Sequence, residues 1–375
     1  MFTTEPSLPQ RIERMVADCP IVDPIALVDP GRRGDLCLTR MLEPVFAEHG
    51  GLPSLTFGTN SSAPEEETLA GVLPRLARTR HTAVGWCFHR ILRDLFDVHE
   101  PQLDASNLAD LLDRIQAASQ DASWSASVYR RANLVAVANA SGRVPVSPGI
   151  QWIDATDRAR LVRESASAFL SLHEIRDQFA RLLAGVAPYC VMNLADLGER
   201  AAPASDQAID PLEVLLELVN DHRRAAILRV GSPDQLSTLA TLLDRYRHAR
   251  FGLLIEPLQP GFATSLLAQG DEWARVRSNV IVIGHGRTVL TASAVAESLS
   301  HRLQVLANSS FAGFASQAAT PEWVYGRFQL VRKATSHALA HMVEAGFYEE
   351  HELPPLLRRI FHDNLSEFLD LPHRD

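Results

Sequence analysis

Lysine is almost absent from this 375-residue chain: Lys333 is the single lysine, and the other 35 of its 36 basic residues are arginine. A Schiff-base lysine, a phosphate-loop lysine or a lysine carbamate between two metals could therefore be built only on Lys333. Asp and Glu total 45, so the formal net charge is −9, and the chain has no basic tract. We expect no nucleic-acid partner.

Cysteine pairs and long apolar runs are missing as well. The four cysteines, Cys19, Cys37, Cys87 and Cys190, form no C-x-x-C pair, which excludes a zinc ribbon and a thioredoxin-like motif. No stretch reaches the roughly 18 apolar residues that a membrane span needs. The polar residues 1–18 do not resemble a signal peptide. We expect a cytoplasmic protein with free thiols and no membrane partner.

Short apolar strands and amphipathic helices alternate through the second half of the chain. Strands are predicted at 188–193, 225–230, 251–256, 279–284 and 304–308, and helices at 211–222, 232–246, 262–276, 292–303 and 323–345. This alternation predicts a parallel α/β sheet that is covered on both faces.

Three earlier strand candidates, at 20–24, 132–138 and 148–153, bring the total to eight. Eight is the number that a closed (β/α)8 TIM barrel needs. A doubly wound open sheet is the alternative, although no G-x-G-x-x-G motif follows the first strand.

A long segment, residues 29–131, separates the first two predicted strands. Its pattern predicts helices at 36–48, 78–96 and 107–116, and a polar loop at 56–67. We interpret this segment as a helical lid insertion in a single domain that spans residues 1–375. A helix or helix pair is predicted over 353–371.

Four segments share the pattern of a known family. Residues 20–27 place an apolar pair and an Asp on the opening strand, 36–42 and 76–96 form helices of the insertion, and 357–368 place an Asn before an aromatic residue. Together they resemble the amidohydrolase superfamily, in particular its amidohydrolase-related and uronate isomerase branch. The resemblance implies a barrel with a divalent-metal site, and it suggests a homo-oligomer.

The metal-binding residues of that family are replaced in this sequence. The two histidines of its H-x-H motif fall on Ile25 and Leu27, its strand histidine on Arg229 and its terminal Asp on Ser310. A divalent site needs three or four N, O or S donors, which Ile and Leu lack, and the charge of Arg229 would repel a cation. We therefore expect no metal at the usual place and no other cofactor.

Polar residues at the predicted carboxyl ends of the strands could form a site without a metal. We assign catalysis to three of these residues and ligand binding to three others: Asp23, Glu256 and His285, and Arg229, Asn193 and Ser310. His285 could act as a general acid or base near neutral pH, and Arg229 could clamp a carboxylate or phosphate. An ion pair of Arg229 with Glu256 or Asp23 is the structural alternative.

Three functional hypotheses remain open. The chain binds a small carboxylate or sugar-acid-like ligand, or performs metal-free acid–base chemistry on it, such as isomerisation or elimination. Alternatively, it is a metal-dependent hydrolase or isomerase with relocated ligands. It could also be a non-catalytic partner or regulator of an active relative.

Overall fold

The computed structural model describes nine stretches of the chain. These are residues 5–26, 36–48, 73–100, 103–139, 151–154, 189–193, 211–256, 263–285 and 291–371, together with the isolated residues 174, 176, 177 and 180. The polar loop expected at 56–67 lies outside them.

Eight strands of the described chain pair in parallel, in two sheets whose strand order follows the chain. The first sheet holds β1 (Ile21–Ala26), β2 (Leu134–Asn139) and β3 (Gln151–Asp154), and the second holds β4 (Tyr189–Asn193), β5 (Ala225–Val230), β6 (Arg250–Ile255), β7 (Val280–Ile283) and β8 (Phe311–Ala312). A doubly wound sheet would instead reverse its order at a switch point. The architecture is therefore mixed α/β and TIM-barrel-like, although no strand pairing joins the two sheets among the described residues.

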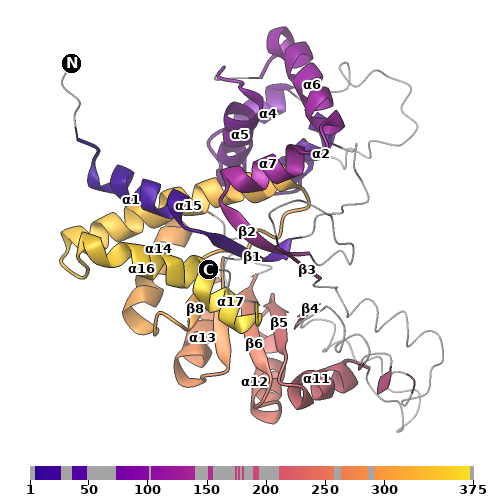
Figure 1. Cartoon of the computed structure of the whole chain (residues 1–375), viewed down its shortest axis with the longest axis vertical. Helices are drawn as coiled ribbons and strands as arrows, with labels where there is room; N and C mark the ends of the chain where they lie inside the picture. The colour runs from indigo at the N-terminus through magenta and orange to yellow at the C-terminus, as the bar shows by residue number, and fades with distance from the viewer. Residues whose placement is uncertain are drawn as a thin grey trace.

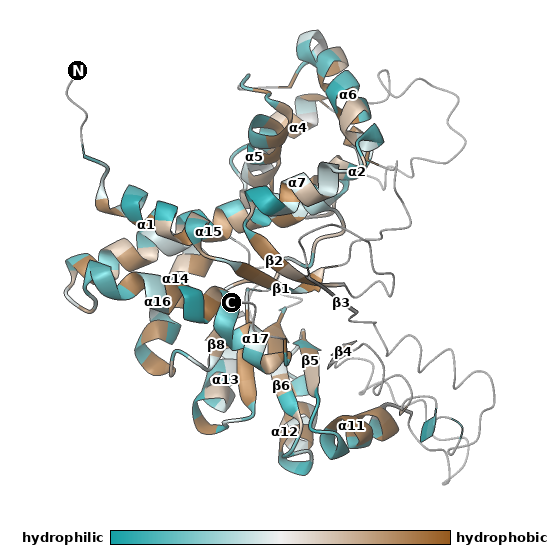
Figure 2. Cartoon of the chain, in the orientation of Figure 1, coloured by the Kyte–Doolittle hydropathy of each residue, from teal (hydrophilic) through white to brown (hydrophobic). Residues whose placement is uncertain are grey.

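Helices alternate with the strands of the second sheet, as the sequence predicts. They are α11 (Pro211–Asp221), α12 (Gln235–Arg245), α13 (Ala263–Val276) and α14 (Ala292–Val305), which follow β4, β5, β6 and β7 in turn (Figure 1). Figure 2 shows apolar strands in the middle of the molecule and polar outer faces on the helices.

The strand predicted at 304–308 is wrong. α14 continues to Val305, and the last strand is the two-residue β8. Val305 is exposed and Leu306 caps the helix, so these apolar residues end a helix instead of crossing the core.

Five helices lie in the described part of the expected insertion, and we call them the insertion helices. They are α2 (Leu38–Glu48), α4 (Leu73–Thr79), α5 (Ala83–Phe96), α6 (Ala105–Gln120) and α7 (Trp124–Arg131). The single helix predicted at 78–96 is two helices, because Thr82 caps the start of α5: its Oγ1 accepts from the Gly85 N–H at 3.1 Å.

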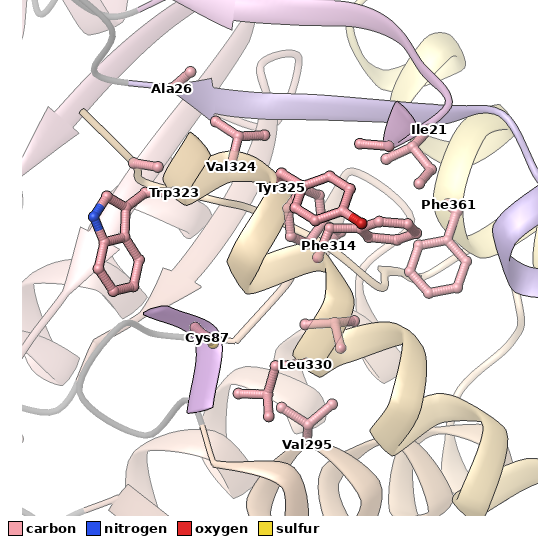
Figure 3. Packing of buried hydrophobic residues seen from close by; sticks show 14 of the residues in the cluster. Ile21, Ala26, Cys87, Val295, Phe314, Trp323, Val324, Tyr325, Leu330 and Phe361 are labelled. Atoms are coloured by element: carbon pink, nitrogen blue, oxygen red, sulfur yellow. The ribbon is translucent and has the colours of Figure 1, made fainter. Parts of the chain in front are cut away.

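The long helix α15 (Pro321–Glu344) packs against the insertion helices α5 and α7 and against α14. Figure 3 shows Trp323, Val324 and Leu330 of this helix among apolar side chains of other elements. Lys333 also lies on α15, with its Nζ 5.7 Å from the centre of the Trp86 ring on α5. No described helix is long and apolar enough to cross a membrane.

The helix α1 (Leu8–Asp18) was not anticipated from the sequence. It buries Ile12 and Val16, four residues apart on one face, and packs against α15. At the other end of the chain, α16 (Leu353–Arg358), a π-helical turn (Arg359–Asp363) and α17 (Asn364–Phe368) follow one another within the region predicted as helical.

One apolar cluster contains side chains from strands of both sheets. Its strand residues are Val22, Ile25, Ala136, Ala138, Val191, Ala225, Ile227, Leu254, Ile283 and Ala312. Leu365 and Phe368 of α17 pack into the same cluster. Arg250, the first residue of β6, donates from Nη1 to Asp370 Oδ1 at 2.7 Å, which puts α17 at the amino ends of the strands. Apolar side chains therefore cover the amino ends of the strands, and a functional site is expected at the carboxyl ends.

We expect Phe368→Ala to lower the free energy of unfolding by about 3–5 kcal/mol, because it empties a buried position at the amino ends of the strands. Phe347→Ala is the matched control, since that ring is 62% exposed and its loss should cost less than about 0.5 kcal/mol. Urea denaturation of both variants measures the difference. Equal losses would show that α17 is not packed into the core.

Candidate functional site

Arg229 and Glu256 lie at the carboxyl ends of two neighbouring strands. Arg229 is in register with Asn193 of β4 and Leu254 of β6, and the Glu256 N–H donates to the Val230 carbonyl at 2.8 Å. Side chains alternate along a strand. Because Ile227 and Leu254 face the apolar cluster, Arg229 and Glu256 are directed to the same interior side.

The two charges form a loose pair. Arg229 Nε lies 3.9 Å from Glu256 Oε2, which is too long for a hydrogen bond. Nε is buried, and none of the described residues accepts a hydrogen bond from it. The side chains are 25% and 18% exposed. The ion pair considered as a structural alternative is therefore present, but it leaves the guanidinium with unused donors.

His285 follows β7 through a turn that requires glycine. Gly284 has φ +54°, and a Cβ there would lie 2.7 Å from the backbone nitrogen of Ala315. His285 therefore lies just beyond the carboxyl end of β7, the strand that pairs with β6. The structure thus brings Arg229, Glu256 and His285 to one edge.

The expectation that His285 titrates near neutral pH is wrong. The imidazole is 6% exposed, and its burial, followed by the charge of Arg302, lowers its pKa to about 3. At neutral pH the ring is uncharged and can donate or accept a hydrogen bond, but it carries no proton to deliver as an acid.

Asp23 sits apart from this edge. Its Oδ1 accepts from the Ser316 N–H at 3.0 Å and from the Ile25 N–H at 3.2 Å, and it makes no described contact with Arg229 or Glu256. The side chain is fully buried, Oδ2 has no hydrogen-bond partner among the described residues, and burial raises the pKa to about 6. Asp23 holds β1 to the segment after β8, which is a structural role.

Ser310 lies at the amino end of β8, not at the carboxyl end where it was expected. Its carbonyl accepts from the Val282 N–H, while the Ala312 carbonyl further along accepts from the Gly284 N–H. The misplaced strand at 304–308 explains this error. Asn193 is the last residue of β4, and its backbone is in register with that of Arg229.

The described residues at the carboxyl ends do not fit a divalent ion. Ile25 is fully buried in the apolar cluster, and Arg229 contributes a positive charge. No three His, Cys, Asp or Glu side chains of the described chain are grouped so as to hold a metal. Leu27 lies outside the described residues.

Sequence reasoning missed a buried ion pair beside His285. Arg302 of α14 donates from Nε to Asp271 Oδ1 of α13 at 3.0 Å, and from Nη1 to the Gly284 carbonyl at 2.9 Å. The spacing of Val295, Leu299 and Arg302 along α14 could have placed this arginine on the buried face of the helix.

Comparison with known proteins gives a match only at the level of structure. No family model and no curated protein matches the sequence. A uronate isomerase from Thermotoga maritima superimposes with a TM-score of 0.73 at 14% identity, covering 98% of this chain and 100% of that one. A glucuronate isomerase from Caulobacter crescentus gives 0.74 at 14% identity, over 100% and 96%.

A candidate metal-dependent hydrolase from Lactobacillus casei ATCC 334 gives a TM-score of 0.57 at 13% identity, over 96% of this chain and 97% of that one. At such identities the likeness concerns the fold alone. The chain has a mixed α/β, TIM-barrel-like fold that is similar to the folds of these proteins.

We expect Asp23→Asn to change how stability depends on pH. The folded-state pKa of about 6 lies above the unfolded value of about 3.9, so protonation favours folding. That contribution is present below pH 4 and is lost as the pH rises through 6. Asparagine keeps the acceptor for Ser316 without the charge, so its stability relative to wild type should rise by about 2–3 kcal/mol between pH 4 and 8.

Urea denaturation of both proteins at pH 4, 6 and 8 measures this change. Asp121→Asn is the control, because hydrogen bonds from Ser123 lower the pKa of this exposed carboxyl and give the opposite direction. If the free energies of unfolding of Asp23→Asn and wild type differed by the same amount at all three pH values, the burial of an ionised Asp23 would be contradicted.

Proposed function

We propose that the carboxyl ends of β5, β6 and β7 bind a small carboxylate ligand of the sugar-acid type, held by Arg229 without a divalent metal. One observation carries the proposal: Arg229, next to the last residue of β5, directs its guanidinium to the side of the apolar cluster, and its buried Nε donates to no described residue. The solved structures with a similar fold include isomerases named for uronate and glucuronate, which are carboxylates.

Arg229 suits a carboxylate for geometric reasons. A guanidinium presents Nε and a terminal nitrogen side by side, and the two can donate parallel hydrogen bonds to both carboxylate oxygens. A buried donor that lacks an acceptor costs about 1–3 kcal/mol. A ligand carboxylate would recover that cost, whereas Glu256 at 3.9 Å does not.

Glu256 and His285 supply the remaining polar groups. Glu256 is the ionic partner of Arg229 among the described residues, and it is placed to accept a proton from a bound ligand. Proton abstraction is the step that isomerisation and elimination of a sugar acid share. His285, uncharged at neutral pH, would hydrogen-bond a ligand hydroxyl.

The absence of a divalent ion from this proposal is supported by the residues at the strand ends. Ile25 offers no donor atom, and Arg229 adds a fixed positive charge to the interior side. Without a metal, a bound water keeps its high pKa, so metal-assisted hydrolysis is not proposed.

We expect Arg229→Met to weaken D-glucuronate binding at least tenfold, because a charge-assisted hydrogen bond contributes about 1.5–3 kcal/mol. Isothermal titration calorimetry measures this loss, with D-glucose as the uncharged comparison ligand. Arg275→Met is the control, since Arg275 is exposed on α13 and pairs with Glu272, and it should bind like wild type. Equal affinity of Arg229→Met and wild type would refute the site.

We also expect D-glucuronate affinity to survive exhaustive dialysis against a chelator, with less than stoichiometric zinc, manganese, iron or magnesium in the purified protein. Elemental analysis by mass spectrometry and a repeated titration check this. A stoichiometric metal, or binding that is lost with the chelator and restored by a divalent ion, would favour relocated metal ligands instead.

A further inference from the structure

The ion pair of Arg302 and Asp271 is buried where the outer helices meet the end of β7. The side chains are 1% and 6% exposed. Arg302 reaches from α14 to Asp271 on α13 and to the backbone carbonyl of Gly284, so one guanidinium connects three elements. Its Nη2 is buried and has no acceptor among the described residues.

Stability alone does not account for such a pair. The cost of removing two charges from water is of the same size as their attraction, and apolar residues of similar volume often replace a buried pair without loss. In this pair Arg302 Nη2 also lacks an acceptor among the described residues, which adds to the free-energy cost of burying it. The bond to the Gly284 carbonyl is the feature that an apolar pair could not reproduce.

The Gly284 carbonyl belongs to the left-handed turn that ends β7. On its other side, the Gly284 N–H donates to the Ala312 carbonyl of β8 at 2.8 Å. The same peptide neighbourhood is crowded by Ala315, which admits no side chain at residue 284. Arg302 therefore holds the carbonyl of the same residue whose N–H is held by β8.

We propose that Arg302 is the positioning residue of the candidate site: by holding the Gly284 carbonyl, it fixes the turn that carries His285 at the carboxyl end of β7. Asp271 orients the guanidinium for this task through Nε. Burial, and after it the nearby positive charge of Arg302, lowers the pKa of His285, so the ring stays an uncharged hydrogen-bonding group. The consequence for ligand binding rests on the proposed function, whereas the effect on the turn does not.

The test replaces the pair as a unit, with Arg302→Met and Asp271→Leu in one protein. The control removes a second Arg–Asp pair, at the amino end of the same strand: Arg277→Met with Asp244→Leu, whose Nη2 and Oδ1 are 2.7 Å apart. Arg302→Lys is the second variant. It keeps the charge but lacks the planar fork that reaches both partners.

Amide hydrogen exchange by NMR is the first readout. We expect the Gly284 amide to exchange at least tenfold faster in the Arg302 pair variant and in Arg302→Lys. The Val282 amide, bonded to the Ser310 carbonyl, should keep its rate and is the internal control. The Arg277 pair variant should leave both rates unchanged.

Titration of His285 and D-glucuronate affinity are the second and third readouts. In wild type the His285 ring signals, assigned with His285→Gln, should not titrate between pH 5 and 8. In the Arg302 pair variant the midpoint should rise, because the charge of Arg302 adds to burial in lowering the pKa of this ring, and the dissociation constant should rise about tenfold.

A folded pair variant with unchanged Gly284 exchange and unchanged His285 titration would overturn the positioning role. If the pair variant does not fold, the same two measurements are made on Arg302→Lys. An unchanged Gly284 exchange rate in Arg302→Lys would then overturn the positioning role. Faster Gly284 exchange in a protein whose wild type binds no D-glucuronate would support the positioning role and refute the proposed function.

Discussion

A buried carboxylate of β1 bonds the segment that follows β8. β8 itself has only two residues, and beyond it Asp23 Oδ1 accepts from the Ser316 N–H at 3.0 Å. One residue later the Gln317 N–H donates to the Ile25 carbonyl at 2.8 Å, which continues the contact with backbone groups. The cost is a carboxyl group with one unsatisfied oxygen in a site that water does not reach. No described strand pairing crosses this seam between the two sheets, where these bonds hold β1 to the segment after β8.

Helix α15 begins at Pro321, shortly after that seam, and its first turns are hydrogen-bonded to the insertion helices. Three residues are involved: Glu322 accepts from Trp124 Nε1 at 2.6 Å, Trp323 Nε1 donates to the Met41 carbonyl at 3.0 Å, and the Tyr325 hydroxyl donates to Asp94 at 2.9 Å. These bonds reach α7, α2 and α5. Burial of Glu322 raises its pKa, so this carboxyl, like Asp23, is held at an electrostatic cost in exchange for a fixed geometry. The insertion is thus placed by polar bonds, while apolar packing such as that in Figure 3 supplies the bulk of the contact.

The features that sequence reasoning predicted are those whose cause is local. β5, β6 and β7 are mostly apolar runs, and α2, α5 and α6 overlap the helices predicted at 36–48, 78–96 and 107–116, so each of these could be identified from its own residues, whereas α7 was not predicted. β8 could not, because two residues carry no periodicity. The role of Asp23 depends on Ser316, 293 residues away, and the suppressed protonation of His285 depends on burial and on Arg302 of another helix. Arg229 was singled out correctly as an unusual strand residue, but its loose contact with Glu256 is a distance that no pattern contains.

The two arginines near the carboxyl ends differ in a way that bears on function. Arg302 is fully buried and bonded to both Asp271 and a backbone carbonyl, so its charge is committed to the fold. Arg229 is partly exposed, and its one ionic partner among the described residues is too far away for a hydrogen bond. A guanidinium at that place can attract and orient an oxyanion, but it cannot activate water as a Lewis acid does. Under the proposed function, Arg229 would therefore bind the carboxylate of the ligand, and no group at the site would act as a Lewis acid. Any chemistry would be proton transfer by Glu256, whose carboxylate lies close to the ligand because it pairs with the same guanidinium.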